Sequence, residues 1–231
     1  MRPRQAQANE NVPGDENEPK QPLRILALHG SEGNGTDFQS RLEHALQECE
    51  SIGGRFDIQI TALTAPFPKG DGYAWWTMGP GQRSFNADTY KGFEESEALI
   101  RGAFEDKEGR GEKFDLVVGH SQGAILTAAL LASQRFPYVP TKGFVLNGVA
   151  MPNPYRSKLH RLDLNDSEKS CRVLFLMGKQ DRVNPLDSAE ELRICLNSAG
   201  AKVSTIEHPG GHSFPFTDIC ALESLSAWIQ R

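Results

Sequence analysis

Gly119-His120-Ser121-Gln122-Gly123 is the stretch on which the expected fold depends. It follows a short apolar run, residues 114–118, that is typical of a strand buried on both faces. It precedes residues 124–132, a longer run rich in Ala and Leu that is typical of a buried helix. A strand, a Gly-x-Ser-x-Gly turn and a helix are the context of a nucleophile elbow, which exposes the serine hydroxyl on a strained turn. We therefore predict that Ser121 is a nucleophile.

Strand-like and helix-like segments alternate on both sides of this turn. Further strands are expected at residues 24–28, 56–63, 143–147, 172–177 and 203–206. Further helices are expected at residues 38–49, 90–108, 188–199 and 216–229. The alternation predicts an α/β fold: a mainly parallel, doubly wound sheet with helices on both faces, and ligands at the carboxyl ends of its strands.

Length, composition and charge limit the number of domains, the partners and the location that we expect for this protein. The 231 residues suit one domain, expected over residues 23–231, after a polar tail, residues 1–22, that we expect to be disordered. The net charge of −5 argues against nucleic acid as a partner. No apolar run approaches the roughly 20 residues of a membrane span, and the acidic start is unlike a targeting peptide. The scattered cysteines predict buried free thiols and a reducing, cytoplasmic location: Cys49, Cys171, Cys195 and Cys220.

Asp181 and His212 are the candidate partners of Ser121. Asp181 lies in the loop after the strand expected at residues 172–177, where a carboxylate is able to accept the N–H of an imidazole; the alternative is a turn or capping role. His212 lies on a glycine-rich turn after the last expected strand. The order Ser121, Asp181, His212 is that of α/β-hydrolase triads.

His208 is the rival base, but its place directly after a strand and before proline favours a structural role. His208 and His212 also have the i,i+4 spacing of a zinc site on a helix. Pro-Gly-Gly between them forbids a regular helix, and no Glu follows His208, so no metal is expected.

The backbone N–H groups of Gln122 and Ser31 are the expected donors to an oxyanion. Gln122 follows the nucleophile, and Ser31 lies in the loop after the first strand, residues 29–35. The alternative for this loop is a dinucleotide-binding turn, but its glycines do not give G-x-G-x-x-G and no acidic residue ends the second strand.

Three aromatic side chains at the same end of the sheet are candidate substrate-binding residues. Trp75 and Trp76 either wall an acyl pocket or pack into the core. His29 either takes part in the site or holds its loop by hydrogen bonds. The polar residues 152–170 are a candidate cover or border of the site.

Together these motifs resemble the FSH-type serine hydrolases of the α/β-hydrolase superfamily, over about Leu23 to Ile229. The resemblance rests on the following segments: Leu28-His29-Gly30, Trp75-Trp76, residues 119–123, Gly178-x-x-Asp181-x-x-x-Pro185 and His208-x-Gly-Gly-His212-x-x-Pro215. One departure is His120, where the family more often has Phe or Tyr; this affects the pocket wall rather than the chemistry, and we include His120 among the substrate-binding candidates.

The resemblance implies hydrolysis of a small-molecule carboxylic ester or thioester, often an acyl-chain ester, without a cofactor. Two alternatives stay open: a peptidase or amidase with the same triad, and a ligand sensor of low turnover on the hydrolase fold. The aromatic loop leads us to expect a preference for medium or longer acyl chains.

Overall fold

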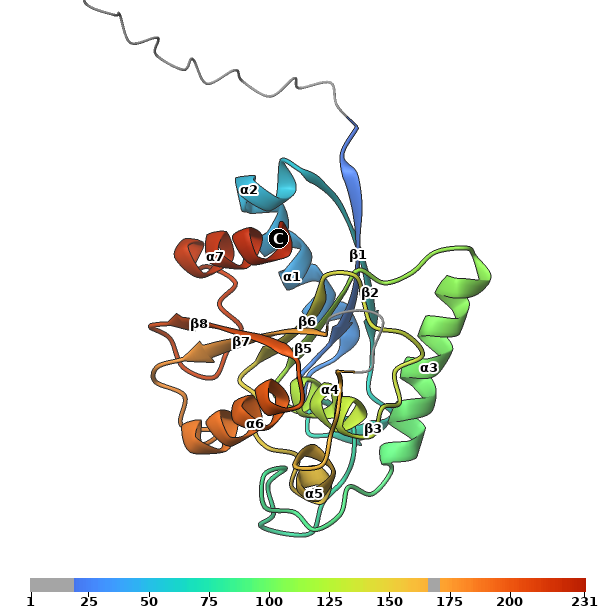
Figure 1. Ribbon diagram of the computed structural model, residues 1–231, viewed down its shortest axis with the longest axis vertical. Helices are drawn as coiled ribbons and strands as arrows, with labels where there is room; N and C mark the ends of the chain where they lie inside the picture. The colour runs from blue at the N-terminus through green and yellow to red at the C-terminus, as the bar shows by residue number, and fades with distance from the viewer. Residues whose placement is uncertain (1–18, 166–170) are drawn as a thin grey trace, which may run out of the picture.

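Six parallel strands form the central sheet of the computed structural model, which describes residues 19–165 and 171–231 (Figure 1). Their order across the sheet is β2-β1-β5-β6-β7-β8. The bounds of these strands are β1 (Gln21–Leu28), β2 (Phe56–Leu63), β5 (Leu116–His120), β6 (Gly143–Asn147), β7 (Arg172–Gly178) and β8 (Lys202–His208). The predicted parallel α/β sheet is thereby confirmed.

Helices cover both faces of this sheet (Figure 1). The helices α1 (Gly35–Glu48), α2 (Glu50–Gly53) and α7 (Ile219–Ile229) pack on one face, and α3 (Phe93–Gly109), α4 (Gln122–Ala132) and α6 (Leu186–Ser198) pack on the other. Side chains alternate along β1 between the two faces. Ile25 and Ala27 pack on the face covered by α1, α2 and α7, and Leu26 and Leu28 pack on the face covered by α3, α4 and α6. Both faces of the sheet are therefore buried, which explains the continuous apolar runs of the sequence.

Several elements differ from the expectation. A short antiparallel hairpin, β3 (Phe67–Lys69) with β4 (Gly72–Ala74), lies within the expected aromatic loop. Residues 152–165 contain a 3₁₀ turn at Asn153–Tyr155 and the helix α5 (Arg156–Leu159), while residues 166–170 lie outside the described chain.

The expected tail also lies mostly outside the described residues. Residues 1–18 are not among those that the structure describes. Gln21 and Pro22 already pair with Phe56 and Asp57 of β2, so the boundary predicted at residue 22 is two residues too late.

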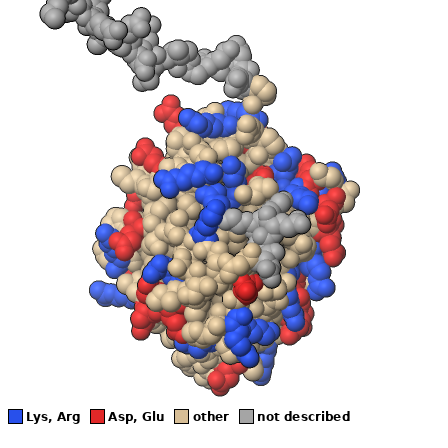
Figure 2. All heavy atoms as spheres, in the orientation of Figure 1, with Lys and Arg blue, Asp and Glu red and all other residues tan. Residues whose placement is uncertain are grey.

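Cys49, Cys171 and Cys195 are buried free thiols as expected, whereas Cys220 is exposed. No helix within the described ranges is long and apolar enough to cross a membrane. On the face shown in Figure 2, Lys and Arg side chains are interspersed with Asp and Glu side chains.

The parallel register brings the carboxyl ends of the strands to one edge of the sheet. Leu28 of β1 lies beside Gly119 of β5, and His120 lies beside Asn147 of β6. On the other side, Gly178 of β7 lies beside His208 of β8. The loops that follow these strands therefore meet at this edge.

Candidate active site

Ser121 occupies a strained turn between β5 and α4. Its backbone has φ 51° and ψ −114°, a conformation that non-glycine residues rarely adopt. The Ser121 N–H donates to the carbonyl of Asn147 (2.9 Å), and its own carbonyl accepts from Ile125 (2.9 Å). The turn is therefore held by the neighbouring strand and by the helix that it begins.

The two glycines of the elbow are required by packing. A Cβ atom at Gly123 would lie 2.3 Å from the carbonyl oxygen of Leu28, and one at Gly119 would lie 2.7 Å from the backbone of Ala124. Neither glycine has a positive φ angle. Their role is thus to let α4 approach β1 and β5 closely, while Ser121 itself carries the strain.

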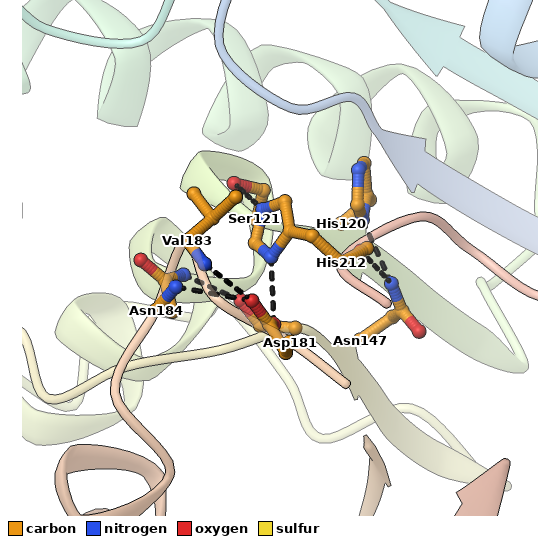
Figure 3. A network of polar contacts seen from close by, with 8 residues as sticks. His120, Ser121, Asn147, Asp181, Val183, Asn184 and His212 are labelled. Atoms are coloured by element: carbon orange, nitrogen blue, oxygen red, sulfur yellow. Dashed lines mark hydrogen bonds and ion pairs between the residues drawn. The ribbon is translucent and has the colours of Figure 1, made fainter. Parts of the chain in front are cut away.

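The structure brings Ser121, His212 and Asp181 together in one hydrogen-bonded row (Figure 3). The Ser121 Oγ and the His212 Nε2 are 2.7 Å apart, and the His212 Nδ1 and the Asp181 Oδ2 are also 2.7 Å apart. The Asp181 side chain is 4% exposed and the His212 side chain is 18% exposed. This arrangement suits a serine nucleophile with an imidazole base and an orienting carboxylate.

Main-chain contacts join the loops that carry Asp181 and His212. The Lys179 N–H donates to the carbonyl of His208 (2.9 Å), and the Gln180 N–H donates to that of Gly210 (3.0 Å). A Cβ atom at Gly178 would lie 1.9 Å from the Gly211 oxygen, so only glycine permits this approach. The relative position of carboxylate and imidazole is therefore fixed by the ends of β7 and β8.

Asp181 is held in its ionised form. Burial opposes ionisation, but hydrogen bonds from His212 and from the N–H groups of Val183 (2.8 Å) and Asn184 (3.1 Å) outweigh it and keep the pKa of the Asp181 carboxyl below its ordinary value. Both backbone groups donate to Oδ1, which leaves Oδ2 for the imidazole.

Gly148 and Asn184 support the histidine and were not anticipated from the sequence. Gly148 follows β6 with φ 56°, and a Cβ atom there would lie 3.0 Å from both Cε1 and Nδ1 of His212. Its carbonyl accepts from the Asn184 side-chain amide (2.6 Å), and Asn184 also binds Asp181. The position of Gly148 at the end of a strand was the sequence signal that could have identified it.

Replacing Gly148 by Ala is expected to lower kcat by about 10- to 100-fold, because the new methyl group would displace the imidazole from Ser121. The positive φ should also cost about 1 kcal/mol of unfolding free energy. The matched control is Gly111→Ala, since Gly111 has φ 72° and no neighbouring atom within 4 Å. Ester-hydrolysis kinetics and chemical denaturation of both variants test this prediction, and equal activity of the two variants would contradict it.

His120 lies behind the histidine and does not line the pocket, which corrects its assignment to substrate binding. Its ring centroid is 5.2 Å from that of His212, and its Nδ1 is 2.8 Å from the Asn147 side-chain amide (Figure 3). Asn147 also donates to the His212 carbonyl (3.4 Å). Burial, with a contribution from His212, lowers the pKa of His120 to about 3, so this ring is a neutral packing partner.

The backbone N–H groups of Gln122 and Ser31 both belong to residues that line the pocket at Ser121. Within the described part of the chain, neither group donates to another protein atom. Gln122 is the first residue of α4, so its N–H lies at the positive end of that helix. The two groups are thus available to an oxygen of a bound ligand.

Trp75 and Trp76 belong to the core, which is the second of the two alternatives and corrects their place among the substrate-binding candidates. They are 0% and 1% exposed, and neither lines the pocket at Ser121. Their main chain instead fixes Gln122: the Trp75 N–H donates to Oε1 of Gln122 (3.0 Å), and Nε2 of Gln122 donates to the Trp76 carbonyl (3.2 Å). The tryptophan loop therefore holds the residue after the serine.

His29 holds its loop and does not line the pocket, contrary to its assignment as a substrate-binding residue. Its Nδ1 is 2.6 Å from the Gly30 carbonyl, its Nε2 accepts from Ala65 N–H (3.0 Å), and burial lowers its pKa. The rival base His208 is also buried, at the end of β8, and Ser121 contacts His212 instead.

A pocket of about 410 Å³ opens at Ser121 and His212. Residues 152–165 do not line it, although Asn153 binds the carbonyl of Ala87 (3.0 Å) in the loop that does. The residues around the pocket are Ser31, Glu32, Lys69, Met78, Gln82, Arg83, Ser84, Ser121, Gln122, Ile125, Val183, Asn184 and His212.

A serine hydroxyl beside a histidine at the carboxyl edge of a parallel, helix-flanked sheet defines the serine hydrolases of the α/β-hydrolase class. The chain belongs to the serine hydrolase (FSH1) family, whose model matches residues 19–220. The match covers the six strands of the central sheet and the loops that carry Ser121, Asp181 and His212.

Curated relatives of similar length carry the name esterase. The protein named Esterase OVCA2 of Danio rerio is 29% identical, in an alignment that covers 84% of this chain and 91% of the relative. The protein of the same name from Xenopus tropicalis is 28% identical, in an alignment that covers 90% of this chain and 92% of the relative.

Solved structures share the fold. The crystal structure of esterase PE8 superposes with a TM-score of 0.69 at 19% identity, covering 91% of this chain and 93% of the other. That of Zea mays acyl-protein thioesterase 2 gives a TM-score of 0.65 at 19% identity, covering 92% and 96%. At these identities the likeness concerns the α/β-hydrolase fold alone.

Proposed function

We propose that this protein hydrolyses carboxylic esters or thioesters through an acyl-enzyme formed on Ser121. The observation that carries the proposal is the row of two 2.7 Å contacts that joins Ser121 to His212 and His212 to Asp181, at the edge of a pocket. The esterase names of the curated relatives support the substrate class.

The reaction begins with attack of the Ser121 Oγ on the carbonyl carbon of the substrate. His212 Nε2 takes the hydroxyl proton, and Asp181, which accepts a hydrogen bond from the Nδ1–H group, orients the ring and stabilises its charged form. The N–H groups of Gln122 and Ser31 donate to the oxyanion of the tetrahedral intermediate. When this intermediate collapses, the protonated His212 gives its proton to the departing alcohol or thiol.

The second half of the reaction consumes the acyl-enzyme. A water molecule gives a proton to His212 Nε2 and attacks the acyl carbonyl, and the same N–H groups stabilise the second oxyanion. Collapse of this intermediate releases the carboxylic acid and returns the proton to the Ser121 Oγ. Apart from this water molecule, the two half-reactions need no second nucleophile and no cofactor.

Covalent labelling tests the proposal directly. A fluorophosphonate, which traps activated serine nucleophiles, should add one phosphonyl group to the folded protein, and peptide mapping should place it on Ser121. Heat-denatured protein is the control, because a serine without its histidine partner should not react. Absence of labelling in folded protein, or labelling at another serine, would refute the proposed nucleophile.

The predicted preference for medium or longer acyl chains loses its basis, because it depended on Trp75 and Trp76 lining the pocket. The apolar pocket residues are Met78, Ile125 and Val183, and Ile125 is only 1% exposed. All of the remaining pocket residues are polar or charged.

A further inference from the structure

The pocket at Ser121 carries more positive than negative charge. Two cationic side chains, Lys69 and Arg83, line it together with one acidic side chain, Glu32. The Asp181 carboxylate lies behind His212, where it is bound by the imidazole and by two backbone N–H groups. It is therefore occupied by protein donors.

Lys69 is already paired, whereas Arg83 is not. The Lys69 Nζ donates to the Ser31 Oγ (2.8 Å) and lies 3.4 Å from the Glu32 carboxylate, which offsets its charge. No ion pair or side-chain hydrogen bond occupies the Arg83 guanidinium among the described residues. An unpaired guanidinium, with its planar set of N–H donors, is suited to bind a carboxylate or phosphate.

The backbone at Arg83 is held in place although its side chain is exposed. The Arg83 N–H donates to the Asn86 side chain (2.7 Å), and the Arg83 carbonyl accepts from Ala87 (2.8 Å). The carbonyl of the next residue, Ser84, accepts from the Tyr90 hydroxyl (2.6 Å). Tyr90 in turn stacks on the buried Trp76 ring with centroids 4.1 Å apart, so the core anchors the loop that presents Arg83.

We propose that the substrate carries an anionic group, a carboxylate or a phosphate, that binds Arg83 while its ester or thioester carbonyl lies at Ser121. This inference rests on the proposed function and specifies its substrate class. The anion belongs either to the acyl part or to the leaving group, since both parts of the substrate must fit near Ser121 during the reaction.

Two matched substrate pairs test the inference. Monoethyl adipate and ethyl hexanoate have six-carbon acyl groups that end in a carboxylate or a methyl group. The pair 3-acetoxybenzoate and phenyl acetate places the carboxylate on the leaving group instead. Rates of acid release are measured for wild type, for Arg83→Gln, and for Arg55→Gln, which removes an exposed arginine that does not line this pocket.

Within each pair we compare kcat/KM for the anionic ester with kcat/KM for its neutral partner. Arg83→Gln is expected to lower this ratio by about fivefold in at least one pair, which is the size of effect that a single exposed charge contact gives. Arg55→Gln should leave both ratios unchanged. Added salt should weaken the wild-type preference, because it screens exposed charges. The pair that responds identifies the part of the substrate that carries the anion.

Two other outcomes are distinguishable. If wild type and Arg83→Gln have equal ratios in both pairs while Ser121-dependent hydrolysis proceeds, the anion inference is overturned and the proposed function stands. If wild type hydrolyses none of the four esters faster than Ser121→Ala does and the fluorophosphonate does not label Ser121, the proposed function itself fails, and the inference fails with it.

Discussion

The Ser121→Ala variant is expected to lose about 10⁴- to 10⁶-fold in kcat, because no other nucleophile replaces the hydroxyl that His212 contacts at 2.7 Å. The fold should survive, since alanine retains the Cβ atom and therefore suits the φ of 51° as well as serine does. Steady-state hydrolysis of an activated ester, together with the chemical denaturation midpoint, measures both effects.

Ser84→Ala is the matched control for this experiment. Ser84 also lines the pocket, but its hydroxyl contacts only the Met78 sulfur, at 3.9 Å, within the described residues. Its replacement should change kcat by less than about threefold, because this hydroxyl does not contact Ser121, His212 or Asp181. If Ser121→Ala retained a rate close to that of Ser84→Ala in pure preparations, Ser121 would not be the nucleophile.

The inner strands β5, β6 and β7 were predictable because each is a short, largely apolar run. The range predicted for β2, residues 56–63, and that for β6, residues 143–147, match the structure at both ends. The proximity of Ser121, Asp181 and His212 was predictable because each follows a strand that ends at the same edge of the sheet.

The contacts around this row were less predictable, because they depend on distances across the fold. Nothing in the local sequence distinguishes a tryptophan that lines a pocket from one such as Trp76, which packs against Tyr90 and Phe93 in the core. The role of Gly148 depends on the His212 ring, which is 64 residues further along the chain. Arg83 is exposed, and only the folded loop brings it to the pocket.

Asp181→Asn is expected to lower kcat by about 10⁴-fold, through the protonation state of His212. In the wild type, the N–H groups of Val183 and Asn184 donate to Oδ1 of Asp181. An asparagine at this position must place its carbonyl oxygen there to keep both bonds, which turns its NH₂ group toward the His212 Nδ1. The imidazole then accepts at Nδ1 and carries its proton on Nε2, where it is unable to take the proton of Ser121.

Asp218→Asn separates this effect from the simple loss of a charge. Asp218 caps α7 by accepting from the Ala221 N–H (3.1 Å), a role that an asparagine oxygen also fills, so this variant should keep full activity.

Proton NMR gives a second readout, because the hydrogen-bonded Nδ1 proton of His212 should be present in wild type and in Asp218→Asn but absent in Asp181→Asn. Retention of that resonance in Asp181→Asn, together with a rate near that of wild type, would show that the carboxylate does not set the tautomer. An asparagine side chain has no ionisable group, so raising the pH should not restore the Asp181→Asn variant to the wild-type rate.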